Sequence, residues 1–244
     1  MKLEYVITSC NLNKLYCDFI PIFIKAWKKL IPDIKIRIIL IAENIPEEYQ
    51  IYKENIILFP PMDNIKTSFI SQYIRLLYPA ILNSEEGVLI TDMDMIPLNS
   101  DYYIKNIEHM DNDKFVYYKG WYYNDPPQYA MCYNIATSKI WAEIFNIHSE
   151  EDIRLRLKER YSDFWCRDQE DLYIYINKWK NKEKDFIMLN DNITNYKRLC
   201  RSQFNGLNRK IISGITNGKY SDYHMLRPNE GKKKEINEKI IELL

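Results

Sequence analysis

The sequence has few of the features on which several common classes of protein depend. Its five cysteines are scattered, odd in number and without CxxC spacing. A disulfide framework is therefore not expected, and a reducing, intracellular setting fits best. Lysine plus arginine and aspartate plus glutamate both number 34, which gives a formal net charge of +0. This balance provides no bulk attraction to nucleic acid or to an anionic membrane, and nucleic acid is not expected as a partner.

Long apolar runs are also missing. Residues 1–9 are too short in apolar run for a signal peptide, and no segment approaches the length of a membrane span. We therefore expect a soluble, cytoplasmic protein without an integral membrane segment. His109 and His148 have no companions at metal-ligand spacing and are predicted at the surface. No Ser-His-Asp or Cys-His order favours nucleophilic hydrolysis.

What the sequence does contain is a regular alternation of strand and helix patterns. Its 244 residues, with no internal repeat or linker, fit one α/β domain. Apolar runs predict strands at 3–8, 36–41, 56–59, 88–90, 115–118, 129–133 and 186–189. Helical spacing predicts helices at 19–30, 67–82, 102–108, 138–145, 150–161 and from Arg167 onward. Segment 9–13 is predicted as a loop, and a second loop is predicted from the strand at 186–189 to residues 211–214. A polar, glycine-punctuated region that contains His224 follows, and then a short final helix. This order indicates a parallel sheet with helices on its faces.

The strongest chemical signal is segment 87–97, a short apolar run that ends in Asp92 and Asp94. In an open α/β sheet, ligands bind at the carboxyl ends of the strands, where these two carboxylates are predicted to lie. Two carboxylates suit Mg²⁺ or Mn²⁺, which keep several waters and also bind substrate phosphates. An Asp-x-Asp also occurs as a polar turn, so the motif alone leaves both interpretations open.

Two residues near the C-terminus extend the hypothesis of a metal and phosphate site. His224 is suited to ligate a cation, and Arg227 to neutralise phosphate. An aspartate nucleophile of the phosphatase type also follows a buried strand as Asp-x-Asp, but it usually begins its domain. The phosphatase remains an alternative.

Residues 87–98, together with the preceding helix 71–79, resemble nucleotide-sugar glycosyltransferases of the GT-A fold with a DxD motif. They are most similar to the small glycosyltransferases of large chlorella viruses. The resemblance implies a single Rossmann-like domain over 1–244, with a mixed, mostly parallel central sheet flanked by helices. Residues 1–133 would form the nucleotide-sugar and metal half. Residues 134–244 would form the acceptor half and the C-terminal metal and phosphate segment.

The same resemblance implies Mn²⁺ or Mg²⁺ as cofactor, a UDP-sugar as donor substrate and a glycan as acceptor. Asp92, Asp94 and His224 would hold the metal, with Asp94 the firmer ligand. The glycine and lysine that usually follow this histidine are replaced here by Leu226, Arg227 and Pro228. Residues implied at the nucleotide sugar are Thr8, Ser9, Cys10, Gln72, Arg75, Asp92 and Arg227.

Asp168 and Gln169 resemble the acidic position near the sugar or the acceptor hydroxyl. A carboxylate there acts as general base in an inverting enzyme, and orients substrate or stabilises charge in a retaining one. The alternative to a catalytic role is that Asp168 caps a helix. The alternative to a substrate-binding role is that Arg75 forms a structural salt bridge. Segment 121–123 is an acceptor platform or a packed loop.

The sequence therefore predicts a metal-dependent glycosyltransferase that moves a monosaccharide from a UDP-sugar to a glycan hydroxyl. In a virus it would act in the host cytoplasm, in the synthesis of glycoprotein glycans. The alternatives are a non-catalytic nucleotide- or sugar-binding module of the same fold and the aspartate-dependent phosphatase. Residue types do not fix the donor sugar, the acceptor, the stereochemical outcome or the oligomeric state.

Overall fold

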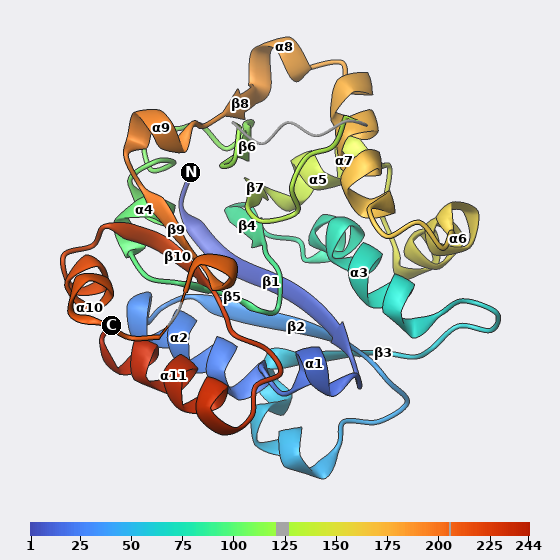
Figure 1. The fold of residues 1–244 in the computed structure, drawn as a ribbon. Helices are drawn as coiled ribbons and strands as arrows, with labels where there is room; N and C mark the ends of the chain where they lie inside the picture. Colours follow the sequence, from blue (N-terminus) through green and yellow to red (C-terminus); the bar gives the residue numbers. More distant parts are fainter. Residues whose placement is uncertain (121–126, 205) are drawn as a thin grey trace.

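A central β-sheet lies between two layers of helices in the computed structural model, which describes residues 1–120, 127–204 and 206–244 (Figure 1). Over these residues the order of strands in the sheet is β3-β2-β1-β4-β7-β6-β8. Its strands are β1 (Leu3–Asn11), β2 (Lys35–Ile41), β3 (Ile56–Phe59), β4 (Gly87–Ile90), β6 (Phe115–Tyr117), β7 (Asn134–Ala136) and β8 (Phe186–Met188). The first four are parallel to one another, whereas β7 runs antiparallel to β4.

The helices connect the strands and cover both faces of the sheet (Figure 1). They are α1 (Lys14–Cys17), α2 (Ile20–Leu30), α3 (Thr67–Leu77), α4 (Ser100–Ile104), α5 (Ser138–Phe145), α6 (Glu150–Arg160), α7 (Arg167–Lys178), α8 (Lys182–Asp185), α9 (Asp191–Thr194), α10 (Arg209–Thr216) and α11 (Gly231–Glu242). Short 3₁₀ helices occupy Glu47–Asn55, Tyr78–Ile81 and Arg201–Gln203.

The sheet separates two hydrophobic cores, because successive side chains of a strand point to opposite faces. On β1, Val6 packs in the core shared with α2 and α11, whereas Ile7 packs in the core shared with α3, α5 and α7. Ile38 and Ile39 divide between the two cores in the same way. Because side chains are buried on both faces of the sheet, the sequences of these strands are continuous runs of apolar residues.

A second, smaller sheet brings the C-terminal part of the chain to the Asp-x-Asp segment. Its order is β5 (Met95–Pro97), β10 (Tyr220–His224) and β9 (Lys197–Cys200). In the antiparallel pair of β5 and β10, Met95 lies opposite His224, and the amide of Met225 donates a 2.9 Å hydrogen bond to the carbonyl of Asp94. In the parallel pair of β10 and β9, His224 lies beside Cys200. This register places residues from three distant parts of the sequence around Asp94.

The predicted fold class is confirmed: the chain forms a single α/β domain with a mixed, mostly parallel sheet flanked by helices. The predicted loop at 9–13 is wrong over its first residues. Ser9 and Cys10 belong to β1, where they pair with Ile39 and Leu40 of β2. The ladder with β2 satisfies the backbone there, so their polar side chains do not end the strand.

Three further predictions of local structure differ from the fold. Residues 129–133 do not form a strand, and β7 begins only at Asn134, where pairing with β4 and β6 begins. Residues 211–214 belong to helix α10, which Asn208 caps by accepting a hydrogen bond from the amide of Ile211. The polar region that contains His224 forms strand β10, which was not predicted because its pairing partners β5 and β9 are distant in sequence.

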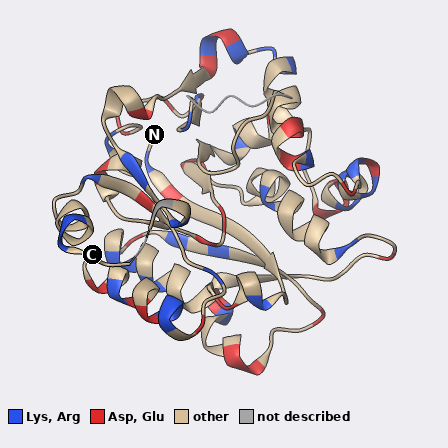
Figure 2. Cartoon of the chain, viewed as in Figure 1, with Lys and Arg blue, Asp and Glu red and all other residues tan. Residues whose placement is uncertain are grey.

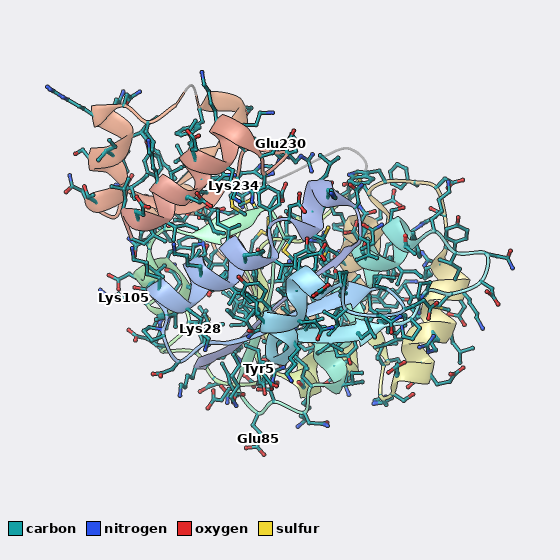
Figure 3. The ribbon with its side chains drawn as sticks, turned by 90° about the horizontal axis from the view of Figure 1, so that it is seen from below. Tyr5, Lys28, Glu85, Lys105, Glu230 and Lys234 are labelled. Carbon is teal, nitrogen blue, oxygen red and sulfur yellow. The ribbon has the colours of Figure 1, made fainter. Side chains whose placement is uncertain are left out.

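Positions of basic and acidic residues are interspersed along the chain, and helices α6, α8 and α11 carry both (Figure 2). The labelled Lys28, Glu85 and Lys105 extend away from the body of the molecule (Figure 3), and His109 and His148 are exposed as predicted. None of the helices in the described part of the chain has both the length and the apolar character that crossing a bilayer requires.

Candidate active site

A cavity of about 480 Å³ lies where β1 and β4 end. Its lining includes Ser9 and Cys10 from the end of β1, Ser71 and Gln72 from α3, and the Asp-x-Asp segment after β4. The Ser9 hydroxyl donates a hydrogen bond to the carbonyl of Ser71, which fixes β1 against α3 at the cavity wall. The volume falls within the usual range for small-molecule sites.

Arg75 joins the two acidic positions that the sequence singled out. Its Nη1 donates to Asp92 Oδ1, and its Nη2 lies 3.3 Å from Asp168 Oδ2. Arg75 is 8% exposed and Asp168 only 1%, whereas the side chain of Asp92 is 32% exposed. The alternative of Arg75 as an ion-paired residue is therefore compatible with a place in the site, because the same side chain also lines the cavity.

Asp168 lies in the first turn of α7, behind the surface of the cavity. It accepts a 3.0 Å hydrogen bond from the amide of Gln169, and Gln72 Nε2 lies 3.4 Å from its Oδ1. Gln169 lines the cavity. Burial raises the pKa of Asp168 to about 6, although the charge of Arg75 opposes the shift. Cys166, not Asp168, occupies the N-cap position of α7, without a side-chain capping hydrogen bond. Asp168 is placed to orient Arg75, Gln72 and Gln169.

The stability of Asp168→Asn relative to the wild type is expected to rise by roughly 2–3 kcal/mol between pH 4 and pH 7.5. The pKa of Asp168 rises from the ordinary 3.8 to about 6 on folding. Ionisation of Asp168 thus destabilises the folded state. This destabilisation reaches its full value as the pH rises above 6, and it disappears as the pH falls toward 3.8. Thermal unfolding of the variant and the wild type at pH 7.5 and pH 4 measures this difference. The exposed Asp33→Asn is the control, and a gain in stability that is equal at both pH values contradicts the assignment.

Asp94 is the centre of a cluster of cationic side chains. Its Oδ2 lies 2.6 Å from Arg201 Nη1, 3.3 Å from His224 Nε2 and 3.5 Å from Arg227 Nη1. Burial of Asp94 opposes its ionisation, but the hydrogen bond and charge of His224 and the charge of Arg201 hold its pKa well below the usual range. Asp94 is therefore a carboxylate at neutral pH, available to a cation.

His224 is oriented by its two ring nitrogens. Nε2 faces Asp94, and Nδ1 lies 4.0 Å from the Sγ of Cys200 on the neighbouring strand. Burial of the ring lowers its pKa, but the hydrogen bond and charge of Asp94 outweigh this and raise it above the ordinary value. A cation would require the neutral ring, so its binding is expected to release a proton from His224.

The side chains around Asp94 fit a divalent cation with two protein ligands. Adjacent ligands of an octahedral ion with bonds of about 2.1 Å are about 3 Å apart, and Asp94 Oδ2 and His224 Nε2 are separated by 3.3 Å. Across the described residues there is no group of three acidic, histidine or cysteine side chains arranged to hold a metal. Asp92, held by Arg75, would have to turn to become a third ligand.

Arg227 closes the cavity on the side of α1. Its Nη1 donates a 2.7 Å hydrogen bond to the hydroxyl of Tyr16, and its guanidinium lies over the Tyr16 ring at 5.3 Å. A third of the Arg227 side chain is exposed, so the guanidinium is accessible to an anion in the cavity.

Most of the residues that the sequence selected come together in this one cavity. Those that line it are Ser9, Cys10, Gln72, Arg75, Asp92, Asp94, Gln169, His224 and Arg227. Thr8 is fully buried in β1 and does not line it, because its side chain alternates with that of Ser9. Asp168 lies behind Arg75 and Gln72. Segment 121–123, which was predicted as an acceptor platform or a packed loop, lies outside the described residues.

Among the residues that line the cavity and that sequence reasoning missed, Arg201, Tyr16 and Trp165 contact or adjoin selected residues. Arg201 contacts Asp94, Tyr16 supports Arg227, and Trp165, 62% exposed, forms part of the rim beside Gln72. Trp165 lies three positions before Asp168 of the selected pair 168–169, so its place in the sequence was a usable signal. Arg201 has no such local signal, because the pairing of β9 with β10 brings it to the site.

The fold and the cavity define an α/β protein of the Rossmann-like type, with a polar site at the carboxyl ends of its parallel strands. Solved structures with the same fold include the galactosyltransferase LgtC in complex with donor and acceptor sugar analogues. The two are 15% identical, with a TM-score of 0.53 over 98% of this chain and 94% of that chain. An active-site glutamine-to-glutamate mutant of LgtC gives a TM-score of 0.54 at the same identity and coverage. No protein-family model matches the sequence, and a search of curated proteins finds no match.

Proposed function

We propose that this chain is a metal-dependent glycosyltransferase that moves a monosaccharide from a UDP-sugar to a hydroxyl group of a glycan. The observation that carries the proposal is the convergence of His224, Arg227 and Asp94 in one cavity at the ends of β1 and β4. A carboxylate and an imidazole suited to a cation thus lie beside a guanidinium suited to a diphosphate. The fold shared with LgtC, a galactosyltransferase, supports the same proposal.

In this proposal Asp94 and His224 would hold the cation, and Asp92 would be a further ligand if its side chain turned from Arg75. A cation bound there would supply Lewis-acid stabilisation of charge on the leaving diphosphate. Arg227, supported by Tyr16, binds phosphate oxygens at the cavity wall. Ser9 and Cys10, at the end of β1, lie beside the nucleoside.

The groups nearest the sugar come from α3 and α7. Gln169 presents its side chain to the cavity, and Asp168 positions Gln169, Gln72 and Arg75 from behind. Because Asp168 is buried, its role is to orient these groups rather than to take a proton from the acceptor hydroxyl directly. This arrangement, with His224 near the metal, favours a retaining reaction.

The phosphatase alternative requires Asp92 to attack phosphorus as a free nucleophile. The ion pair with Arg75 holds Asp92 Oδ1 and lowers its nucleophilicity. The alternative of a non-catalytic binding module differs from the proposed enzyme only in turnover.

Isothermal titration calorimetry with UDP, with and without Mn²⁺, tests the proposed site, and hydrolysis of UDP-sugars tests turnover. We expect UDP to bind more tightly with Mn²⁺ and at least one UDP-sugar to be slowly hydrolysed without acceptor. Binding without hydrolysis or transfer identifies the binding module. Absence of UDP binding in both conditions contradicts the proposed function.

A further inference from the structure

Three cationic side chains of this site converge on a single oxygen atom. Arg201, His224 and Arg227 all face the Oδ2 of Asp94, and Arg201, at 2.6 Å, is the nearest of them. The side chain of Asp94 is 6% exposed, so little solvent screens these charges. Two guanidinium groups and an imidazole thus share one carboxylate, which leaves excess positive charge at the cavity wall.

The oxygen that Arg201 occupies is the one that a cation would bind beside His224. A divalent cation lies about 2.1 Å from a carboxylate oxygen, and the Arg201 nitrogen lies 2.6 Å from the same atom. The two positive groups would then be only about 3–4 Å apart and would repel each other strongly at low dielectric. Arg201 and the cation therefore compete for Asp94 Oδ2.

When it does not contact Asp94, the Arg201 side chain can bind an anion within the same cavity. It directly follows β9, its side chain is 23% exposed, and it lines the cavity together with Arg227. Its other hydrogen bond, 3.3 Å from Nη1 to the carbonyl of Met225, is to a neutral acceptor and is readily exchanged. The planar donors of arginine match the oxygens of a diphosphate.

We propose that Arg201 and a divalent cation compete for Asp94, and that the diphosphate of the nucleotide sugar binds the Arg201 guanidinium once the cation has displaced it. The inference rests on the proposed function for the identity of the diphosphate. Its consequence is that cation and nucleotide bind cooperatively: the cation frees a phosphate-binding group, and the phosphate removes a competitor of the cation. By linkage, each ligand increases the affinity of the other by the same factor.

Mn²⁺ binding to the full chain without nucleotide provides the first test. Arg201→Gln is expected to bind Mn²⁺ about tenfold more tightly than the wild type, because the competing charge is gone. The matched control is Lys197→Gln, which removes one positive charge from an exposed position on the same strand. Its Mn²⁺ affinity is expected to stay within twofold of the wild type. Equal Mn²⁺ affinity of the wild type and Arg201→Gln overturns the competition.

Mn²⁺ binding at saturating UDP provides the second test. UDP is expected to increase the Mn²⁺ affinity of the wild type by a larger factor than that of Arg201→Gln, whose UDP affinity in Mn²⁺ falls about tenfold. An equal factor in both proteins overturns the transfer of Arg201 to the diphosphate. Failure of the wild type to bind UDP contradicts the proposed function and the binding of Arg201 to the diphosphate. The comparison of Mn²⁺ affinities without UDP still decides whether Arg201 and the cation compete for Asp94.

Discussion

Asp94→Asn is expected to lower the rate of the proposed sugar transfer by a factor of about 10³ or more, because the loss of the proposed metal ligand removes several kcal/mol of charge stabilisation. Asn keeps the size of the side chain but not its charge. The variant leaves Arg201, His224 and Arg227 facing one another without a carboxylate, so a cation meets only repulsion at this point. Mn²⁺-dependent UDP binding should therefore fall in parallel with the rate.

The measurement is transfer or donor hydrolysis, together with calorimetry of UDP in Mn²⁺. Asp33→Asn serves as the control, since Asp33 is exposed and lies between α2 and β2, outside the cavity. Circular dichroism checks that both variants are folded. Mn²⁺-dependent UDP binding that survives in Asp94→Asn would show that the cation is held elsewhere.

Arg75→Met is expected to destabilise the folded chain by about 3–5 kcal/mol at pH 7.5, the usual cost of removing one partner from a buried ion pair. Arg75 lies between Asp92 and the nearly inaccessible Asp168. Without the guanidinium, the ionised form of Asp168 is buried without a counter-charge, and its pKa rises further above 6. As the pH falls through that raised pKa, Asp168 takes up a proton and the destabilisation shrinks.

Thermal unfolding at pH 7.5 and pH 5 measures this effect. For a chain of this size the expected loss at pH 7.5 is roughly 10 °C in Tm. The double variant Arg75→Met/Asp168→Asn should recover a large part of the loss, because the buried charge is then absent. If the double variant is as unstable as Arg75→Met alone, packing of the arginine and not its charge stabilises this region.

The parts of the site that could be predicted from the sequence are those specified by local pattern. The continuous apolar run of β4 places Asp92 at a strand end, and the helical spacing of α3 places Gln72 and Arg75 on a helix beside it. Both elements are determined within about a dozen residues, so their prediction did not depend on tertiary contacts.

The other half of the site depends on pairing between segments that are far apart in the sequence. His224 is separated from Asp94 by 130 residues, and Arg201 from Asp94 by 107. His224 ends β10 and Arg201 directly follows β9. Both strands are short and rich in polar residues, and β10 buries Ser221 and Asp222, so neither shows the apolar pattern of a buried strand. Its residue type beside Arg227, together with the family resemblance, selected His224, but no local signal selected Arg201.

The pairing of β5 with β10 also determines when the site becomes complete during synthesis. Residues 87–97 leave the ribosome well before residues 220–227, and closing a loop of this length precedes any contact between Asp94 and His224. The parallel strands β1 to β4 have by then all been made, together with α3. A growing chain can thus carry its acidic pair on a formed sheet without the histidine and arginines that give that pair its chemistry.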